Sequence, residues 1–431
     1  MNRKERRNKK KEINILNDLI TVINKYFPEL INKFNGLTDL RNKSYVKYQM
    51  KVIFIVRLMG LMCEIKSMQG MTRELNTEEA IQNIARICNL ELDEIPHCDT
   101  INDVFEKVKV EEIEKIRKYM ITKLIRGKII QKYKIRDRYY HVIVDGTGLA
   151  TSRKKYNENC LVKNKTDKNG NEYQEYSTYV LEAKLVVGEM VFSIGSEFVE
   201  NADENTTKQD CEINAFKRLA EKIKKEYPKL KILISGDALY ACKAVFDICK
   251  ENGWKYIIRF KEGAIPSLYN EFETVVAKEN ESTVKDYEYV TKLDYQKEKV
   301  NVIKYTDTKK GTEFVYITDL QITNKNIKET INIGRKRWKI ENEGFNIQKN
   351  GTFDIGHLYS KNQVAIKVHY FMIQIAHMLR QLIEKGLKSI KEMNLKLKEI
   401  SQNIKQKLIS TIISNLEVHT KIQLRFEWII Y

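Results

Sequence analysis

The stretch KILISGDALYACKAVFDICKENGWKYIIRF, residues 231–260, contains the pattern that decides the fold. It begins with a short apolar run of the kind that forms a buried strand, and it ends with a second one, WKYIIRF. The segment between the two runs, YACKAVFDICKEN, is predicted to be a helix. A strand, a helix and a strand in this order predict a helical crossover between strands of one sheet, and therefore an α/β fold.

The sequence before this stretch predicts three further strands and a helix. The strands are YYHVIVDG (139–146), STYVLEAKLVVG (177–188) and MVFSIGSEFV (190–199), and the helix is KQDCEINAFKRLAEKIKKEY (208–227), which ends at Pro228. Three strands, a helix and then alternating strands and helices form the element order of the ribonuclease H fold. We therefore predict an RNase H-like mixed sheet with flanking helices.

The periodicity of apolar residues changes along the chain and predicts five segments. Residues 1–135 have a helical pattern, which by itself indicates no function, and residues 136–261 form the first part of the α/β core. A DNA-binding role for the helical N-terminal domain is expected only from the family resemblance described below. Residues 262–326 contain short β segments separated by turn residues and are predicted to be an all-β insertion. Residues 327–385 complete the core, and residues 386–431 form a helical C-terminal segment.

The charge of the chain restricts its partners. The 431 residues have a formal net charge of +18, which points to a polyanion, with nucleic acid favoured over an anionic membrane. The longest apolar run extends only from Val52 to Ile65, is interrupted by Arg57 and is too short to span a bilayer. No signal peptide is evident, and the seven cysteines contain no C-x-x-C pair. We expect a cytoplasmic protein without a membrane partner or structural zinc.

Two aspartates stand at the carboxyl ends of predicted strands. Asp145 follows the apolar run in HVIVDGTGLATS (141–152), and Asp237 follows the strand that begins at Lys231. Singly, each has an ordinary explanation, because Asp-Gly forms turns and aspartate caps helices. Neighbouring strands lie about 4.8 Å apart, however, so the two carboxylates would repel one another unless a cation lay between them. Divalent cations with oxygen ligands resolve that conflict.

A third acid is available on the helix predicted near residues 327–349. Glu341 and Glu343 are two residues apart, so only one of them can face the sheet. Arg337 precedes Glu341 by four residues and shares its face of the helix. The same spacing is also typical of a simple ion pair on a helix surface, and the sequence leaves both interpretations open.

The three acidic motifs together resemble a known family. VDGTG (144–148), SGDALY (235–240) and RWKIENEGF (337–345), in this order, resemble the motifs of the DDE-type bacterial insertion-sequence transposases. The similar branch of that family has an inserted β segment before the third acid and an Arg-Trp-x-Ile-Glu helix. The resemblance extends over roughly residues 95–385, and its spacing and element order make it specific.

This resemblance implies a role for each matching residue. Asp145, Asp237 and Glu341 are expected to be the catalytic acids and to hold two Mg²⁺ ions, which Mn²⁺ is expected to replace. Arg337 is expected to bind a DNA phosphate near the cut, and Trp338 to pack beside it. Gly146 and Gly148 are expected to leave space for the approach of DNA.

Two positions differ from the family pattern. The family has a tyrosine three residues before the arginine, where this chain has Gly334, and a lysine seven residues after the glutamate, where this chain has Gln348. Lys349 is the next residue, and we expect it to contact DNA instead.

The implied activity is DNA transposition. The protein is expected to cut the ends of an insertion element by metal-dependent phosphodiester hydrolysis and to transfer the 3′-hydroxyl strands into target DNA. Its partners would be terminal inverted repeats and target DNA, bound by a homodimer in the synaptic complex.

Parts of the sequence are also compatible with two other functions. One is a catalytically silent, transposase-derived DNA-binding protein, which the presence of all three acids disfavours. The other is a sugar-kinase or actin-like ATPase with DGTG (145–148) as a phosphate loop. That alternative lacks an adenosine motif and leaves the charge of +18 unexplained.

Overall fold

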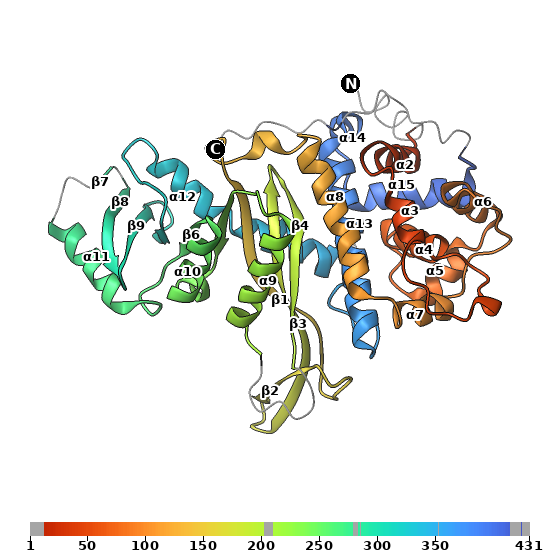
Figure 1. Ribbon diagram of the computed structural model, residues 1–431, viewed down its shortest axis with the longest axis horizontal. Coiled ribbons are helices and arrows are strands. Elements are labelled where there is room, and N and C mark those ends of the chain that lie inside the picture. Colours follow the sequence, from red (N-terminus) through yellow and green to blue (C-terminus); the bar gives the residue numbers. More distant parts are fainter. Residues whose placement is uncertain are drawn as a thin grey trace.

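The computed structural model describes residues 13–201, 210–278, 283–284, 286–351, 353–413 and 424 (Figure 1). Residues 1–12, at the start of the predicted N-terminal domain, lie outside this part of the chain. The strands are β1 (Tyr140–Ser152), β2 (Leu161–Thr166), β3 (Glu172–Val187), β4 (Met190–Val199), β5 (Ile232–Gly236), β6 (Lys255–Arg259), β7 (Thr283–Val284), β8 (Tyr287–Tyr295), β9 (Glu298–Asp307) and β10 (Thr312–Thr318).

These ten strands of the described residues form one mixed sheet. Its central order is β4-β3-β1-β5-β6, in which β3 is antiparallel to both of its neighbours. β5 runs parallel to β1 and to β6, and the helix between β5 and β6 forms the crossover that joins these two strands. This arrangement confirms the predicted RNase H-like sheet. The short strand β2 pairs with the first half of β3, and the long β2–β3 hairpin projects from the body of the molecule (Figure 1).

The segment between the second and third acids extends the same sheet. β10 pairs antiparallel with β6, and β9, β8 and β7 follow in order to the far edge. The prediction that this insertion is all-β was wrong in one respect, because it begins with helix α11 (Pro266–Lys278). Leu268, Phe272 and Val276 recur every four residues and place an apolar stripe on one side, and proline is favoured in the first turn of a helix.

Helices cover both faces of the sheet. On one face lie α9 (Glu212–Glu226) and α10 (Lys243–Asn252), and Leu219 and Ile223 of α9 pack closely over Gly195 of β4. On the other face lie α12 (Ile327–Arg335) and the π-helix η5 (Ile340–Gly351). Ile143 of β1 packs there with Phe345 of η5. The sheet is therefore the middle layer of three.

The helical N-terminal region packs against the core from one side (Figure 1). Its helices are α2 (Ile15–Tyr26), α3 (Leu30–Asn35), α4 (Met50–Met62), α5 (Met68–Leu75), α6 (Glu78–Cys88), α7 (Cys98–Phe105) and α8 (Val110–Arg126). α4 is buried along nearly its whole length, which explains its mostly apolar composition, and Arg57 within it is buried as well. Within the described residues, no helix has the length and apolar character needed to cross a membrane.

The C-terminal helices join the N-terminal helices and not only the core. They are α13 (Gln363–Gly386), α14 (Lys388–Met393) and α15 (Leu397–Ser410). α13 lies between the sheet and the N-terminal helices, where it contacts β4 on one side and α4 and α8 on the other. α15 packs against α2 and α6. The two ends of the described chain thus form one helical layer beside the sheet and its covering helices.

Candidate active site

The first acid, Asp145, lies where β1 passes beyond its pairing with β5. The two strands pair in parallel only as far as Ile143 and Ser235, two residues before each aspartate. β1 continues along β3, with Asp145 opposite Glu182. The Asp145 side chain is 18% exposed, so it can reach solvent at the surface of the sheet while most of it is buried.

The second acid, Asp237, follows the last residue of β5. Its carboxylate accepts a hydrogen bond of 2.9 Å from the Leu239 backbone N–H and so caps the short 3₁₀ helix η3 (Ala238–Tyr240). Asp237 therefore has the capping role that the sequence allowed. Asp237 also belongs to the site, because its charge acts on Asp145 and on Arg337.

The third acid, Glu341, comes to these aspartates from η5. Arg337 connects them, because its Nη1 lies 2.7 Å from Glu341 Oε1 and 3.6 Å from Asp145 Oδ2. Burial acts to lower the pKa of Arg337, but the hydrogen bond to Glu341 and the charges of all three carboxylates raise it. The structure thus brings Asp145 and Glu341 to one guanidinium group and places Asp237 near enough for its charge to act on that group.

The electrostatics of Asp145 show that its charged form is disfavoured in the folded chain. Burial, together with the charges of Glu341 and Asp237, raises the pKa of Asp145 to about 7 against the opposing effects of Arg337 and the Gly146 N–H. Three carboxylates on three separate elements, with few cations to neutralise them, form the oxygen-only donor set that hard divalent cations prefer. The residues present therefore fit a Mg²⁺ or Mn²⁺ site.

The π-helical form of η5 decides which residue after Glu341 faces the site. Hydrogen bonds to the fifth residue make each turn wider than an α-turn, so seven residues fall short of two full turns. Gln348 therefore points into the core, where its side chain is fully buried and its amide donates to Gln374 and lies 2.9 Å from His377 Nδ1. Lys349 lies on the side of Asp145, whose charge acts on it, while burial lowers the pKa of Lys349.

Of the remaining positions near Arg337, Trp338 lies at the surface and Gly334 is buried. Trp338 is 44% exposed, next to the half-buried Arg337. Gly334 faces the ring of Tyr316 on β10, and a Cβ atom at this position would lie 2.7 Å from that ring. This contact gives a physical reason for glycine at the position where the family pattern has tyrosine.

The space beside each aspartate is filled by a tyrosine that the sequence reasoning missed. Gly146 was predicted to leave space for DNA, and this was wrong, because the phenol of Tyr179 occupies the place of its missing side chain. Gly148 does face open space. Gly236, just before Asp237, is covered by the ring of Tyr240. A glycine adjacent to each acid was the one signal in the sequence that could have indicated close packing there.

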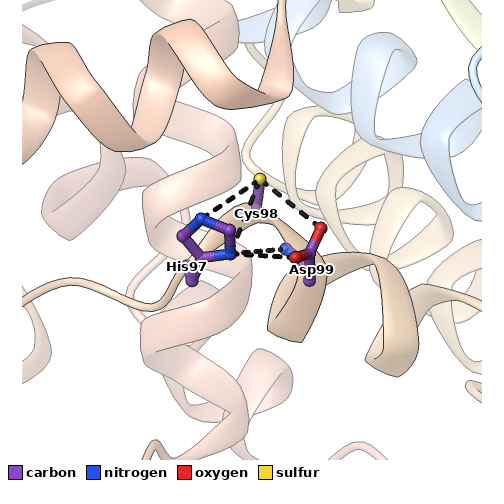
Figure 2. Close-up of side chains that lie close together, drawn as sticks. All are labelled: His97, Cys98 and Asp99. Carbon is purple, nitrogen blue, oxygen red and sulfur yellow. Dashed lines mark hydrogen bonds and ion pairs between the residues drawn. The ribbon is translucent and has the colours of Figure 1, made fainter.

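A separate group of possible metal ligands lies at the start of α7 (Figure 2). Ligand atoms of His97, Cys98 and Asp99 all lie within 4.8 Å of one another. His97 is the N-cap of α7, and its Nδ1 accepts a hydrogen bond from the Asp99 backbone N–H. Since the three residues are consecutive, helix capping explains their closeness.

Comparisons with known proteins identify the family of the chain. The family model described as Transposase DDE domain group 1 matches residues 198–424, and one described as DDE_Tnp_1-associated matches residues 31–120. No curated protein matches the chain. A cryo-EM structure of a piggyBac transposase synaptic complex with hairpin DNA is 12% identical, with a TM-score of 0.43 over 92% of this chain and 80% of that chain. Since the first match covers more than half of the residues, the chain belongs to the family of DDE-domain transposases, group 1.

Proposed function

We propose that this protein is an active DNA transposase that cuts the ends of an insertion element and transfers the resulting 3′-hydroxyl strands into target DNA. The observation that carries the proposal is that Arg337 contacts both Asp145 of β1 and Glu341 of η5, while the charge of Asp237, directly after β5, acts on the same arginine. Membership of the transposase family and the net charge of +18 support DNA as the substrate.

The three acids would hold two divalent cations, Mg²⁺ or Mn²⁺. Such a pair of cations supplies a nucleophile that is deprotonated near neutral pH and compensates the negative charge of the attacked phosphate. Asp145 lies on β1, Asp237 directly follows β5 and Glu341 lies on η5, which packs on the sheet. A metal site requires such ligands to be held in a defined geometry.

Arg337 would change its partners during the reaction. In the structure its guanidinium neutralises Glu341 and Asp145. When those carboxylates bind cations, the guanidinium becomes available for a DNA phosphate, which it can bind through two parallel hydrogen bonds. Lys349, on the same side as Asp145, would contact a second phosphate, and the exposed ring of Trp338 would pack beside the DNA. We propose that two copies of the chain act together in the synaptic complex.

The proposal is tested by a cleavage assay on the DNA that flanks the gene. Wild type, Asp237→Asn and the control Asp247→Asn are compared with Mg²⁺, with Mn²⁺ and with a chelator. Asp247 has the same charge but lies on α10 in an ion pair with Lys243. We expect discrete, metal-dependent nicks from wild type and the control, and none from Asp237→Asn, which should still bind DNA.

Either of two results would contradict the proposal. Substantial cutting by Asp237→Asn would remove this residue from the catalytic set. Tight DNA binding by wild type without cleavage under any metal condition would favour the silent, transposase-derived DNA-binding protein. In that case Gly334 and Gln348, which depart from the family pattern, would be the first positions to examine.

A further inference from the structure

Backbone pairing does not set the distance between the two catalytic aspartates. The parallel ladder between β1 and β5 ends at Ile143 and Ser235. Asp145 and Asp237 each lie two residues farther on, where no hydrogen bond of this ladder connects the two strands. Because metal ligands must be held in a defined geometry, side chains must supply the missing connection.

One half of that connection begins on β3. Tyr179 lies opposite Gly148 in the β1–β3 register, and its phenol packs over Gly146, directly after Asp145. The Tyr179 hydroxyl donates a hydrogen bond of 3.1 Å to Oε2 of Glu212. Burial, together with the nearby charges of Glu212 and both aspartates, raises the pKa of Tyr179, so its hydroxyl keeps its proton and remains a donor.

The other half begins just after β5. Tyr240 follows Asp237 by three residues, is fully buried and packs over Gly236. Its ring also makes an edge-to-face contact with Phe216 of α9, with centroids 5.5 Å apart. The Tyr240 hydroxyl donates to the second oxygen of the same carboxylate, Oε1 of Glu212.

The Glu212 carboxylate therefore accepts one hydrogen bond from Tyr179, which packs beside Asp145, and one from Tyr240, which packs beside Asp237. We call Tyr179, Glu212 and Tyr240 the Glu212 bridge. Glu212 is the first residue of α9, where the helix dipole favours a negative charge. α9 packs on the sheet face opposite to η5. The Glu212 bridge therefore supports the backbone at both aspartates from the α9 face, and Glu212 lies on the side away from Glu341.

We propose that Glu212 is a positioning residue that sets the separation of Asp145 and Asp237 for binding divalent cations. The inference rests on the proposed function for its purpose, but its test does not depend on DNA cleavage. Loss of the bridge should let Asp145 and Asp237 move relative to one another, while the backbone pairing of β1 with β5 stays intact. The carboxylates would then bind cations less tightly.

The test measures Mn²⁺ binding to the full-length chain by electron paramagnetic resonance. Glu212→Gln keeps the size of the side chain but removes one acceptor oxygen, and Tyr179→Phe removes one hydroxyl while keeping the ring over Gly146. We expect each variant to bind Mn²⁺ about 10- to 100-fold more weakly than wild type, as is typical when the supports of metal ligands are removed. Tyr48→Phe is the matched control, because it also breaks a tyrosine–glutamate hydrogen bond, to Glu94 in the helical region.

The outcomes separate this proposal from others. Equal Mn²⁺ affinity in wild type and both variants, or no binding by wild type, would overturn it. Weak binding by Glu212→Gln but normal or tighter binding by Tyr179→Phe would make Glu212 a direct ligand and would also overturn it. If Glu212→Gln does not fold, as judged by thermal unfolding, Tyr179→Phe decides the question. A wild type whose Mn²⁺ affinity depends on the bridge but that does not cut DNA would refute the proposed function alone.

Discussion

Replacing Asp145 with asparagine should stabilise the protein at neutral and alkaline pH when no divalent cation is present. Burial and the neighbouring carboxylates raise the pKa of Asp145 from 3.8 to about 7. Between these two values the folded chain holds a proton at Asp145 that the unfolded chain has lost. The free energy of unfolding therefore falls as the pH rises through this window.

The pKa values give the size of the effect. Each pH unit between the folded and unfolded pKa corresponds to about 1.4 kcal/mol, so the rise to about 7 corresponds to about 4 kcal/mol at pH 8. The amide side chain of the Asp145→Asn variant cannot ionise and would avoid this loss. The advantage of the variant over wild type should be small near pH 4, should grow between pH 4 and 7, and should become constant above pH 7.

Thermal unfolding in a chelator, measured at one-unit intervals from pH 4 to 8, tests this reasoning. Asp294→Asn serves as the control, because Asp294 carries the same charge on a side chain that is 76% exposed. Addition of Mg²⁺ at pH 8 should stabilise wild type more than Asp145→Asn, since the carboxylate then gains a ligand. A difference between wild type and Asp145→Asn that does not change with pH would refute the assignment of Asp145 as a carboxylate strained by burial and like charge.

Two further substitutions test the surroundings of the acids. Arg337→Ala should weaken DNA binding and lower the slope of log affinity against log salt by about 0.9, the value for one phosphate contact. An unchanged slope, measured by fluorescence anisotropy, would leave Arg337 as only the partner of Glu341. Gln348→Lys would restore the family residue but would bury a second ammonium beside Lys184, whose Nζ donates to Gln374, the neighbour of Gln348. It should destabilise the protein by roughly 3 kcal/mol or more, and urea unfolding equal to wild type would contradict the inward orientation of Gln348.

The order of strands and helices in the core could be predicted from the sequence because their patterns are local. A strand alternates every two residues and a helix repeats every 3.6, so each element shows its type within a few residues. The insertion was predicted less well. Its turn residues and short apolar runs correctly indicated strands, but the helical repeat of apolar residues in α11 was not predicted.

The sequence also placed Asp237 correctly at the end of a strand. It placed Asp145 at a strand end as well, but β1 continues to Ser152, and it predicted one helix where α12 and η5 are separated by a turn that contains Arg337. The structure shows the Arg337–Glu341 ion pair that the spacing allows. The sequence could not show that Asp145 shares the same guanidinium, because that contact joins β1 to a segment almost two hundred residues later.

The surroundings of the acids depend on the packing of segments that are distant along the chain. Local periodicity and residue chemistry are enough to identify the carboxylates, their order and the type of element that carries each one. The sequence by itself did not determine that Gln348 turns inward and Lys349 outward, because that depends on the wider turn of η5 packed against α13. Nor did it show that Tyr179, Tyr240 and Glu212 meet behind the two aspartates. Such contacts join residues far apart in the chain, and they form only when the sheet and its covering helices are packed together.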